Sequence, residues 1–161
     1  MELTQNPSVL ELVRKTAELT TPKEIVWIDG SEAQLESLRK IAVETGELIK
    51  LNEEKLPGCY LNRSDVNDVA RVEGRTFICS RTREEAGPTN NWMDPDEMKA
   101  KLHEILRCAM AGRTMYVIPY SMGVIGSPFA KYGIEVTDSI YVVLNMAIMT
   151  RIGTKVLDAL G

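Results

Sequence analysis

The sequence predicts an α/β fold in a single domain that spans residues 1–161. Two observations carry this prediction: apolar residues recur at helical spacing in several segments, and short β-prone runs bounded by turn residues lie between those segments. The chain has 161 residues, of which 44% are hydrophobic. This is near the size at which one compact core buries most of the apolar surface, so one domain is expected.

The opening of the chain alternates helix and strand. Apolar residues in 7–20 recur at intervals of three and four, which is typical of one helical face. Residues 24–29 are rich in β-branched and aromatic residues and precede a glycine, so they are expected to form a buried strand that ends in a turn. Ser31 and Gln34 have the spacing of a capping box, which predicts a second helix that ends at Gly46.

The middle of the chain is predicted to hold short strands and one long helix. Residues 47–51, 59–62 and 76–80 are short β-prone runs, and 81–92 contains glycine, proline and asparagine residues that mark an exposed loop. The long helix is expected over 94–112, between a capping aspartate and a terminating glycine. Its expected buried face consists of Met98, Leu102, Ile105, Leu106 and Ala109.

The last third is predicted to contain a strand over 114–119, a glycine-bearing loop over 120–128 and a helix over 154–160. The long apolar run 139–151 is expected to be mostly strand. The chain stops at Gly161, a helix-ending residue, which fits a chosen boundary better than a natural terminus.

Composition argues against several classes of function. The formal net charge of −4 disfavours nucleic-acid and anionic-membrane partners, since no local basic cluster offsets it. No apolar run approaches the roughly 20 residues of a membrane helix, and the start resembles no signal peptide, so a cytoplasmic location is expected. Three scattered cysteines, Cys59, Cys79 and Cys108, predict reduced thiols rather than disulfides or a zinc site.

The sequence lacks the common catalytic motifs: GxxxxGK[ST], GxGxxG, HExxH and GxSxG are all absent. His103, the one histidine, lies inside the predicted long helix, and the pattern favours a surface residue over a catalytic base. The methionines Met115, Met122, Met146 and Met149 are expected to fill gaps in the core.

Two charged clusters leave alternatives open. In 65–73, Arg71 precedes a predicted strand, where a guanidinium can hold a carboxylate or phosphate through two hydrogen bonds. The pattern alone favours the other interpretation, a surface ion pair with Glu73 or Asp68. The cluster 81–85 is interpreted as a solvated loop. Glycines in 121–128 suit either a ligand-lining turn or a structural one, and the chemistry favours the structural turn.

Several stretches together resemble one family in order and spacing. They are 68–73, 91–93, 112–119, 121–123, 126–128, 137–139, 141–143, 148–151 and 157–161, with a further likeness at 29–31. In this combination the chain resembles the amino-terminal third of GTP-dependent phosphoenolpyruvate carboxykinases. The resemblance implies the amino-terminal domain of that fold, with a mixed sheet flanked by helices.

The resemblance also implies an activity for the parent enzyme. That enzyme interconverts oxaloacetate and GTP with phosphoenolpyruvate, carbon dioxide and GDP, as in gluconeogenesis, and uses a manganese ion and a magnesium ion. The position of Arg71 implies binding of oxaloacetate or phosphoenolpyruvate, and that of Glu73 implies contact with a mobile lid. The family's catalytic, metal-binding and nucleotide-binding residues would follow Gly161, so none is expected here.

The resemblance leads to three expectations for the isolated chain and leaves one rival hypothesis. The isolated chain is expected to be inactive, to bind no cofactor, and to expose apolar surface that promotes self-association, because its partner would be the missing carboxy-terminal half. The rival is a stand-alone binding or interaction module that kept the fold and lost the chemistry. The sequence departs from the commoner family pattern at Val124 and Ala147, which puts packing and assembly contacts in doubt.

Overall fold

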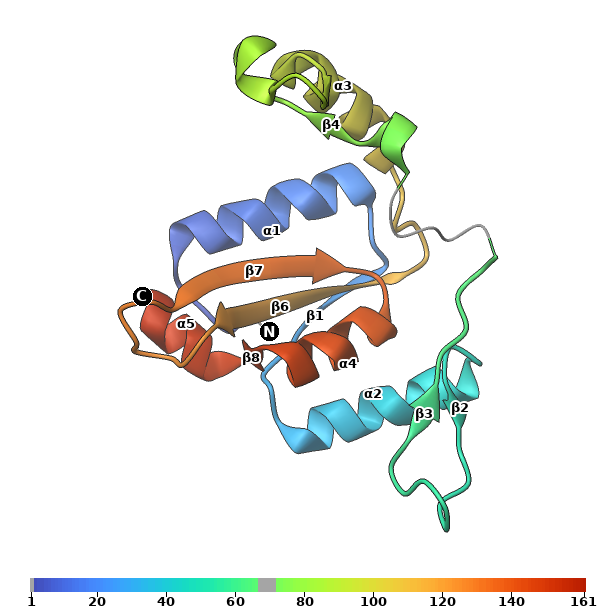
Figure 1. Cartoon of the computed structure of the whole chain (residues 1–161). Coiled ribbons are helices and arrows are strands. Elements are labelled where there is room, and N and C mark those ends of the chain that lie inside the picture. Colours follow the sequence, from blue (N-terminus) through green and yellow to red (C-terminus); the bar gives the residue numbers. More distant parts are fainter. Residues whose placement is uncertain (1, 67–71) are drawn as a thin grey trace.

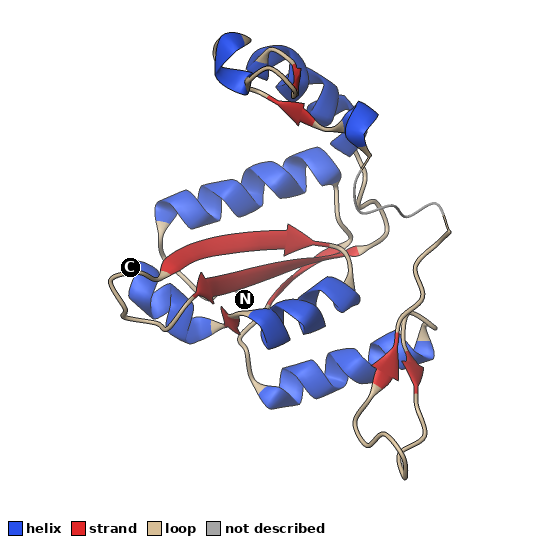
Figure 2. Ribbon diagram, viewed as in Figure 1, coloured by secondary structure: helices blue, strands red, loops and turns tan. Residues whose placement is uncertain are grey.

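The computed structural model describes residues 2–66 and 72–161 and places helices around a central sheet (Figures 1 and 2). The helices in this part of the chain are α1 (Pro7–Thr20), α2 (Glu32–Glu44), α3 (Pro95–Leu106), α4 (Ile140–Met149) and α5 (Thr154–Leu160). The strands are β1 (Glu24–Trp27), β2 (Ile49–Lys50), β3 (Tyr60–Leu61), β4 (Phe77–Ile78), β5 (Asn91–Trp92), β6 (Thr114–Met122), β7 (Lys131–Thr137) and β8 (Arg151–Ile152). Short 3-10 helices, η1 (Glu73–Arg75) and η2 (Glu84–Ala86), flank β4.

The central sheet is mixed, as expected. Its middle strand β6 pairs in parallel with β1, where Trp27 lies opposite Val117, and antiparallel with β7, where Tyr120 lies opposite Gly133. The short β8 pairs antiparallel with the end of β6. Two further pairs lie outside this sheet: the antiparallel pair β2–β3 and the parallel pair β4–β5.

Helices cover both faces of this sheet, and β6 supplies both cores. Its side chains alternate, because successive residues of a strand point to opposite faces. Met115 and Val117 belong to the cluster that includes α1 and α5, whereas Tyr116 and Ile118 belong to the cluster that includes α2 and α4. Full burial of each such aliphatic side chain contributes about 1.5–3 kcal/mol. The two clusters therefore join β6 to helices from both ends of the chain.

The first two helices are confirmed, with one change in capping. α1 has the predicted bounds, and the Oγ of Ser31 accepts a hydrogen bond from the amide of Gln34 at 3.2 Å, which begins α2. The side chain of Gln34 does not return to the Ser31 amide, as a full capping box requires. Its amide group bonds instead to the backbone of Asp29 and Trp27, each at 2.9 Å. Gln34 therefore ties α2 to the end of β1.

The prediction of a strand over 139–151 is wrong, because most of that run is helix α4. Ser139 begins the helix and accepts a hydrogen bond from the amide of Val142 at 3.4 Å. Glu47 also bonds to this terminus, accepting from the Ser139 hydroxyl and the Tyr141 amide at 2.9 Å each. Strand β7, which was not predicted, precedes this helix.

The prediction for the long helix is confirmed at its start and wrong at its end and in its buried face. Asp94 accepts from the amides of Asp96 and Glu97, but the helix ends at Leu106 rather than at Gly112. None of its residues is buried; Leu102 is 45% exposed, Ile105 73% and Leu106 42%. Ala109 is also exposed, and Met98 is half-buried.

The methionine prediction holds for two of the four residues. Met115 is fully buried in the sheet, and Met146 packs against the core beside α2. Met122 and Met149 are 54% and 73% exposed, so the prediction that they fill core gaps is wrong. Both lie near the end of β6, where β8 completes the sheet edge.

Candidate functional site

The segment that carries the sequence-predicted site is described from Val72 onward. Arg71 lies outside the described residues, so its placement stays a prediction. Glu73 begins η1 and is exposed. Its backbone carbonyl accepts hydrogen bonds from the side-chain amide of Asn91 at 2.8 Å and from the amide of Thr76 at 3.2 Å. The carboxylate of Glu73 is left at the surface, where it can meet another element.

Asn91 and Trp92 fix the backbone that follows Arg71. The Asn91 side chain also donates to the carbonyl of Thr76 at 3.2 Å, and the indole of Trp92 donates to the carbonyl of Ser80 at 3.0 Å. The parallel pairing of β4 with β5 brings these residues together. Sequence reasoning assigned Asn91 and Trp92 no role, although both lie in a stretch that carried the family resemblance.

An ion pair joins two other motif stretches. The guanidinium of Arg113, the residue before β6, lies 2.6 Å from the carboxylate of Asp138, which follows β7. The Arg113 side chain is 65% exposed, so the pair contributes only about 0–1 kcal/mol. Its role is to hold the ends of two neighbouring strands together.

The glycine-bearing turn after β6 has internal contacts that explain its sequence. Gly123 and Gly126 both have positive φ, 93° and 84°, which glycine adopts without strain. The buried Ser121 donates to the Gly123 carbonyl at 3.2 Å, and the Gly126 amide donates to the hydroxyl of Tyr132 at 2.8 Å. These contacts support the structural interpretation of the turn.

The described residues offer no set of ligands for a metal ion. Among residues 2–66 and 72–161, no group of three histidine, cysteine, aspartate or glutamate side chains gathers closely enough to hold one. His103 lies on the exposed surface of α3, and Cys59, Cys79 and Cys108 are free and exposed. The manganese and magnesium expected for the parent enzyme do not fit the donors described here.

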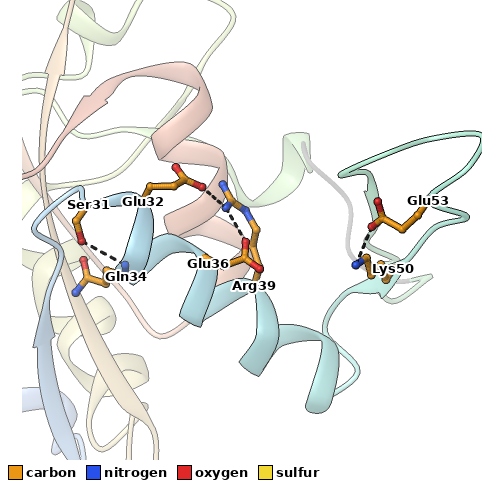
Figure 3. Close-up of polar contacts among 7 residues, drawn as sticks. All are labelled: Ser31, Glu32, Gln34, Glu36, Arg39, Lys50 and Glu53. Atoms are coloured by element: carbon orange, nitrogen blue, oxygen red, sulfur yellow. Dashed lines mark hydrogen bonds and ion pairs between the residues drawn. The ribbon is translucent and has the colours of Figure 1, made fainter.

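A groove of about 440 Å³ lies between α2, the β2–β3 pair and α4. Its lining consists of Glu36, Arg39, Leu48, Gly58, Tyr60, Asn62, Tyr141, Leu144, Asn145 and Ile148. Arg39 donates to Glu32 and Glu36, and these hydrogen bonds, that to Glu32 first, raise the pKa of its guanidinium against the opposing effect of burial (Figure 3). Two carboxylates thus already surround this cation, so the groove does not suit an anionic substrate.

Near this groove, Lys50 and Glu53 form a second pair at 2.8 Å (Figure 3). Their hydrogen bond raises the pKa of the Lys50 ammonium and lowers that of the Glu53 carboxyl. Both side chains are about half exposed, so the pair organises the turn between β2 and β3 rather than a reaction centre.

Comparison with known proteins assigns the family. The model of the phosphoenolpyruvate carboxykinase N-terminal domain matches residues 11–161. The chain belongs to the phosphoenolpyruvate carboxykinase family. It is 54% identical over 156 residues to a phosphoenolpyruvate carboxykinase [GTP] of Neocallimastix frontalis, covering 97% of this chain and 26% of the relative. It is 55% identical over 158 residues to the enzyme of that name from Corynebacterium kroppenstedtii, covering 98% and 25%.

A third carboxykinase [GTP], from Anaeromyxobacter dehalogenans, is 54% identical over 158 residues, covering 98% of this chain and 26% of the relative. The chain therefore spans about a quarter of the length of the curated carboxykinases it matches. The described helices include none that is long and apolar enough to cross a membrane.

Proposed function

We propose that this chain is the substrate-side portion of a GTP-dependent phosphoenolpyruvate carboxykinase. The parent enzyme would convert oxaloacetate and GTP to phosphoenolpyruvate, carbon dioxide and GDP. The observation that carries the proposal is the match of residues 11–161 to the amino-terminal domain of the family, together with relatives at 54–55% identity that bear the name phosphoenolpyruvate carboxykinase [GTP].

Arg71 is the residue proposed to bind substrate. A guanidinium presents a planar set of donors that matches the two oxygens of a carboxylate or phosphate, and it stays charged at every physiological pH. Fixing that charge beside the developing enolate would orient the substrate and stabilise its negative charge. The hydrogen bonds from Asn91 to the carbonyls of Glu73 and Thr76 support this role, because they restrain the backbone immediately after Arg71.

Glu73 is proposed to contact a lid that closes over the site. Its side chain is exposed, and its backbone carbonyl accepts a hydrogen bond from the side chain of Asn91. The backbone is therefore restrained, and the side chain is accessible to another element. A lid that excluded water would protect the enolate from protonation. The lid, the metal ions and the nucleotide would all be held by the remainder of the parent enzyme, which is the proposed partner of this chain.

Phosphoenolpyruvate binding to the 161-residue chain tests the role of Arg71. Calorimetric titration is expected to show weak binding that Arg71→Ala weakens by about ten- to hundredfold, the loss typical of hydrogen bonds to a charged group. Arg75→Ala is the matched control, because Arg75 is a nearby arginine that ends η1 and is exposed, and it should change the affinity by less than about twofold.

Two results would contradict the proposal. Equal binding by the wild-type chain and Arg71→Ala would remove Arg71 from the substrate site. No response to phosphoenolpyruvate or oxaloacetate, combined with specific binding of a protein partner, would favour the stand-alone interaction module.

A further inference from the structure

A segment of the chain stands apart from the main core with almost no core of its own. We call residues 72–107 the arm; it includes η1, β4, η2, β5 and α3, and Figure 1 shows it beyond α1, away from the central sheet. Within its 36 positions, all of them described, only Ala86 is buried. Phe77, Trp92 and Met93 are half-buried around the β4–β5 pair.

Helix α3 exposes several large apolar side chains of the arm. Its apolar face consists of Met98, Leu102, Ile105 and Leu106, at the spacing of one helical stripe. The Glu97–Lys101 pair, at 2.8 Å, flanks this stripe. An amphipathic helix of this kind normally buries its apolar stripe, yet Ile105 is 73% exposed and Leu102 is 45% exposed.

The arm is too small to compensate for this exposure by itself. Chains below about 40 residues bury too little apolar surface to hold one structure without a disulfide, a metal or a partner. Cys79, the only cysteine within these residues, is free, and the described residues hold no metal cluster. Within the described chain the arm contacts α1 through α3, and this contact leaves the apolar side chains of α3 exposed. A partner could cover them.

We propose that the apolar face of α3 is covered by polypeptide that follows Gly161 in the parent carboxykinase. This inference rests on the proposed function. The occupant is chosen because the matched relatives are about four times as long as this chain, so most of their polypeptide lies outside the part they share with it. A second copy of the chain is less suitable, since one short helical face is small beside the roughly 800 Å² per partner that a stable interface buries.

The arm follows Arg71 directly in the chain, so a contact with the arm would also affect the segment around this arginine. The arm begins one residue after Arg71, and its first turn is tied to β5 through Asn91. Polypeptide that packs on α3 would therefore hold the segment next to the substrate arginine. The covering polypeptide would thus restrain the segment next to Arg71. It would also bring the part of the parent enzyme that is proposed to hold the metal ions and the nucleotide close to this segment.

Hydrogen exchange provides the test, read by mass spectrometry on the native polypeptide that carries this segment and on the 161-residue chain. The amides of α3 are expected to exchange at least about tenfold more slowly in the native polypeptide, since burial of one large aliphatic side chain shifts an opening equilibrium by that factor or more. Equal exchange in the two, or a native polypeptide that ends at Gly161, would overturn the proposal. Protection that rises with the concentration of the 161-residue chain alone would assign the face to a second copy and would also overturn it.

A matched pair of variants in the native polypeptide locates the contact. Ile105→Glu places a charge on the apolar face and should speed α3 exchange by about ten- to hundredfold. His103→Glu places the same charge on the other side of the helix and should change the exchange by less than about twofold. Slow exchange in β6 verifies that each variant is folded. Similar effects of the two variants would overturn the proposal.

The activity of the same native polypeptide separates the two proposals. If it forms phosphoenolpyruvate from oxaloacetate and GTP while α3 exchanges as fast as in the short chain, only the covering contact is wrong. If α3 is protected but no phosphoenolpyruvate forms, the proposed function is wrong, and the covering segment belongs to a protein of another activity.

Discussion

Gly153 lies against the backbone that follows β1, and the two segments leave no room for a side chain. A Cβ on Gly153 would overlap the carbonyl group of Asp29, and one on Gly30 would lie 2.6 Å from the carbonyl oxygen of Ile152. The amide of Thr154 donates to the same Asp29 carbonyl at 3.2 Å. This contact joins the beginning of α5 to the end of the first strand, so it depends on both glycines.

Gly153→Ala is expected to lower the free energy of unfolding by more than about 3 kcal/mol, because the new methyl group would force two backbones apart. Gly46→Ala is the control: Gly46 also has positive φ, but a Cβ there meets nothing within 4 Å, so only the backbone cost of about 1–2 kcal/mol applies. Urea denaturation measures both. Equal losses would contradict the close approach.

Tyr116 gives the chain a dependence on alkaline pH. Burial raises the pKa of its phenol above the ordinary value of about 10, although a hydrogen bond with Thr114 acts in the opposite direction. A raised folded-state pKa means that the folded chain holds its proton more tightly than the unfolded chain, so stability is full below about pH 10 and falls as the pH rises beyond it.

Tyr116→Phe is therefore expected to flatten the decline of unfolding free energy above about pH 10. Urea denaturation at several pH values from about 8 to about 11, on both sides of the ordinary tyrosine pKa, measures how the free energy of unfolding changes with pH. Tyr141→Phe removes a hydroxyl from a side chain that is 42% exposed and controls for the loss of a phenol. A slope unchanged by Tyr116→Phe would contradict the assignment.

At the residue scale, the sequence indicated Arg71 only through the family resemblance, since its local pattern favoured a surface ion pair. Asn91 was missed for a physical reason: the carbonyls it binds lie 15 and 18 positions earlier in the chain. No local spacing rule encodes such a contact. Capping at Ser31 and Asp94, by contrast, acts over two or three residues and was predicted correctly.

Helix α4 shows how a distant residue can help define an element. Glu47, which lies between α2 and β2, accepts hydrogen bonds from the Ser139 hydroxyl and the Tyr141 amide. A carboxylate at a helix N-terminus satisfies an amide that has no partner within the helix and interacts favourably with the helix dipole. The contact joins the segment that follows α2 to the beginning of α4, and these two helices cover one face of the sheet.

Glu47→Ala is expected to lower the free energy of unfolding by about 1–2 kcal/mol through loss of this capping interaction. Glu44→Ala, at the exposed end of α2, should cost less than about 0.5 kcal/mol. Thermal and urea denaturation of both variants measure the difference. A larger loss in Glu44→Ala would show that Glu47 has no special role at α4.

At the element scale, prediction succeeded where periodicity was clear and failed where it was not. α1 and α5 have amphipathic patterns and were predicted correctly. The run that forms α4 is apolar almost throughout, and such a run does not separate a strand from a buried helix. For α3 the stripe was recognised, but its burial depends on a neighbour that lies outside the 161 residues under the proposal above.

At the scale of the whole molecule, the chain combines a well-packed body with an arm that is poorly covered. The body has buried clusters on both faces of its sheet, whereas the arm has one buried residue. Mixed α/β architecture and family could be predicted because they depend on patterns spread over the whole chain. Arg71 lies outside the described residues, so its place in the site stays a prediction.

The isolated 161 residues are expected to form no phosphoenolpyruvate from oxaloacetate and GTP. The reaction needs metal ions and a nucleotide held together, and the described residues supply no cluster that fits a metal. A coupled assay for GDP and phosphoenolpyruvate, run at high protein concentration with manganese and magnesium present, measures this. Turnover by this chain alone would contradict the proposal that the metal and nucleotide sites lie in the remainder of the parent enzyme.

The most direct test of the central claim is GTP-dependent phosphoenolpyruvate formation by the native polypeptide that carries this segment. We predict that it is several-fold longer than this chain and produces phosphoenolpyruvate and GDP in equal amounts, and that Arg71→Ala lowers kcat/KM by about ten- to hundredfold or more. A native polypeptide without this activity, or one whose activity is unaffected by Arg71→Ala, would contradict the account.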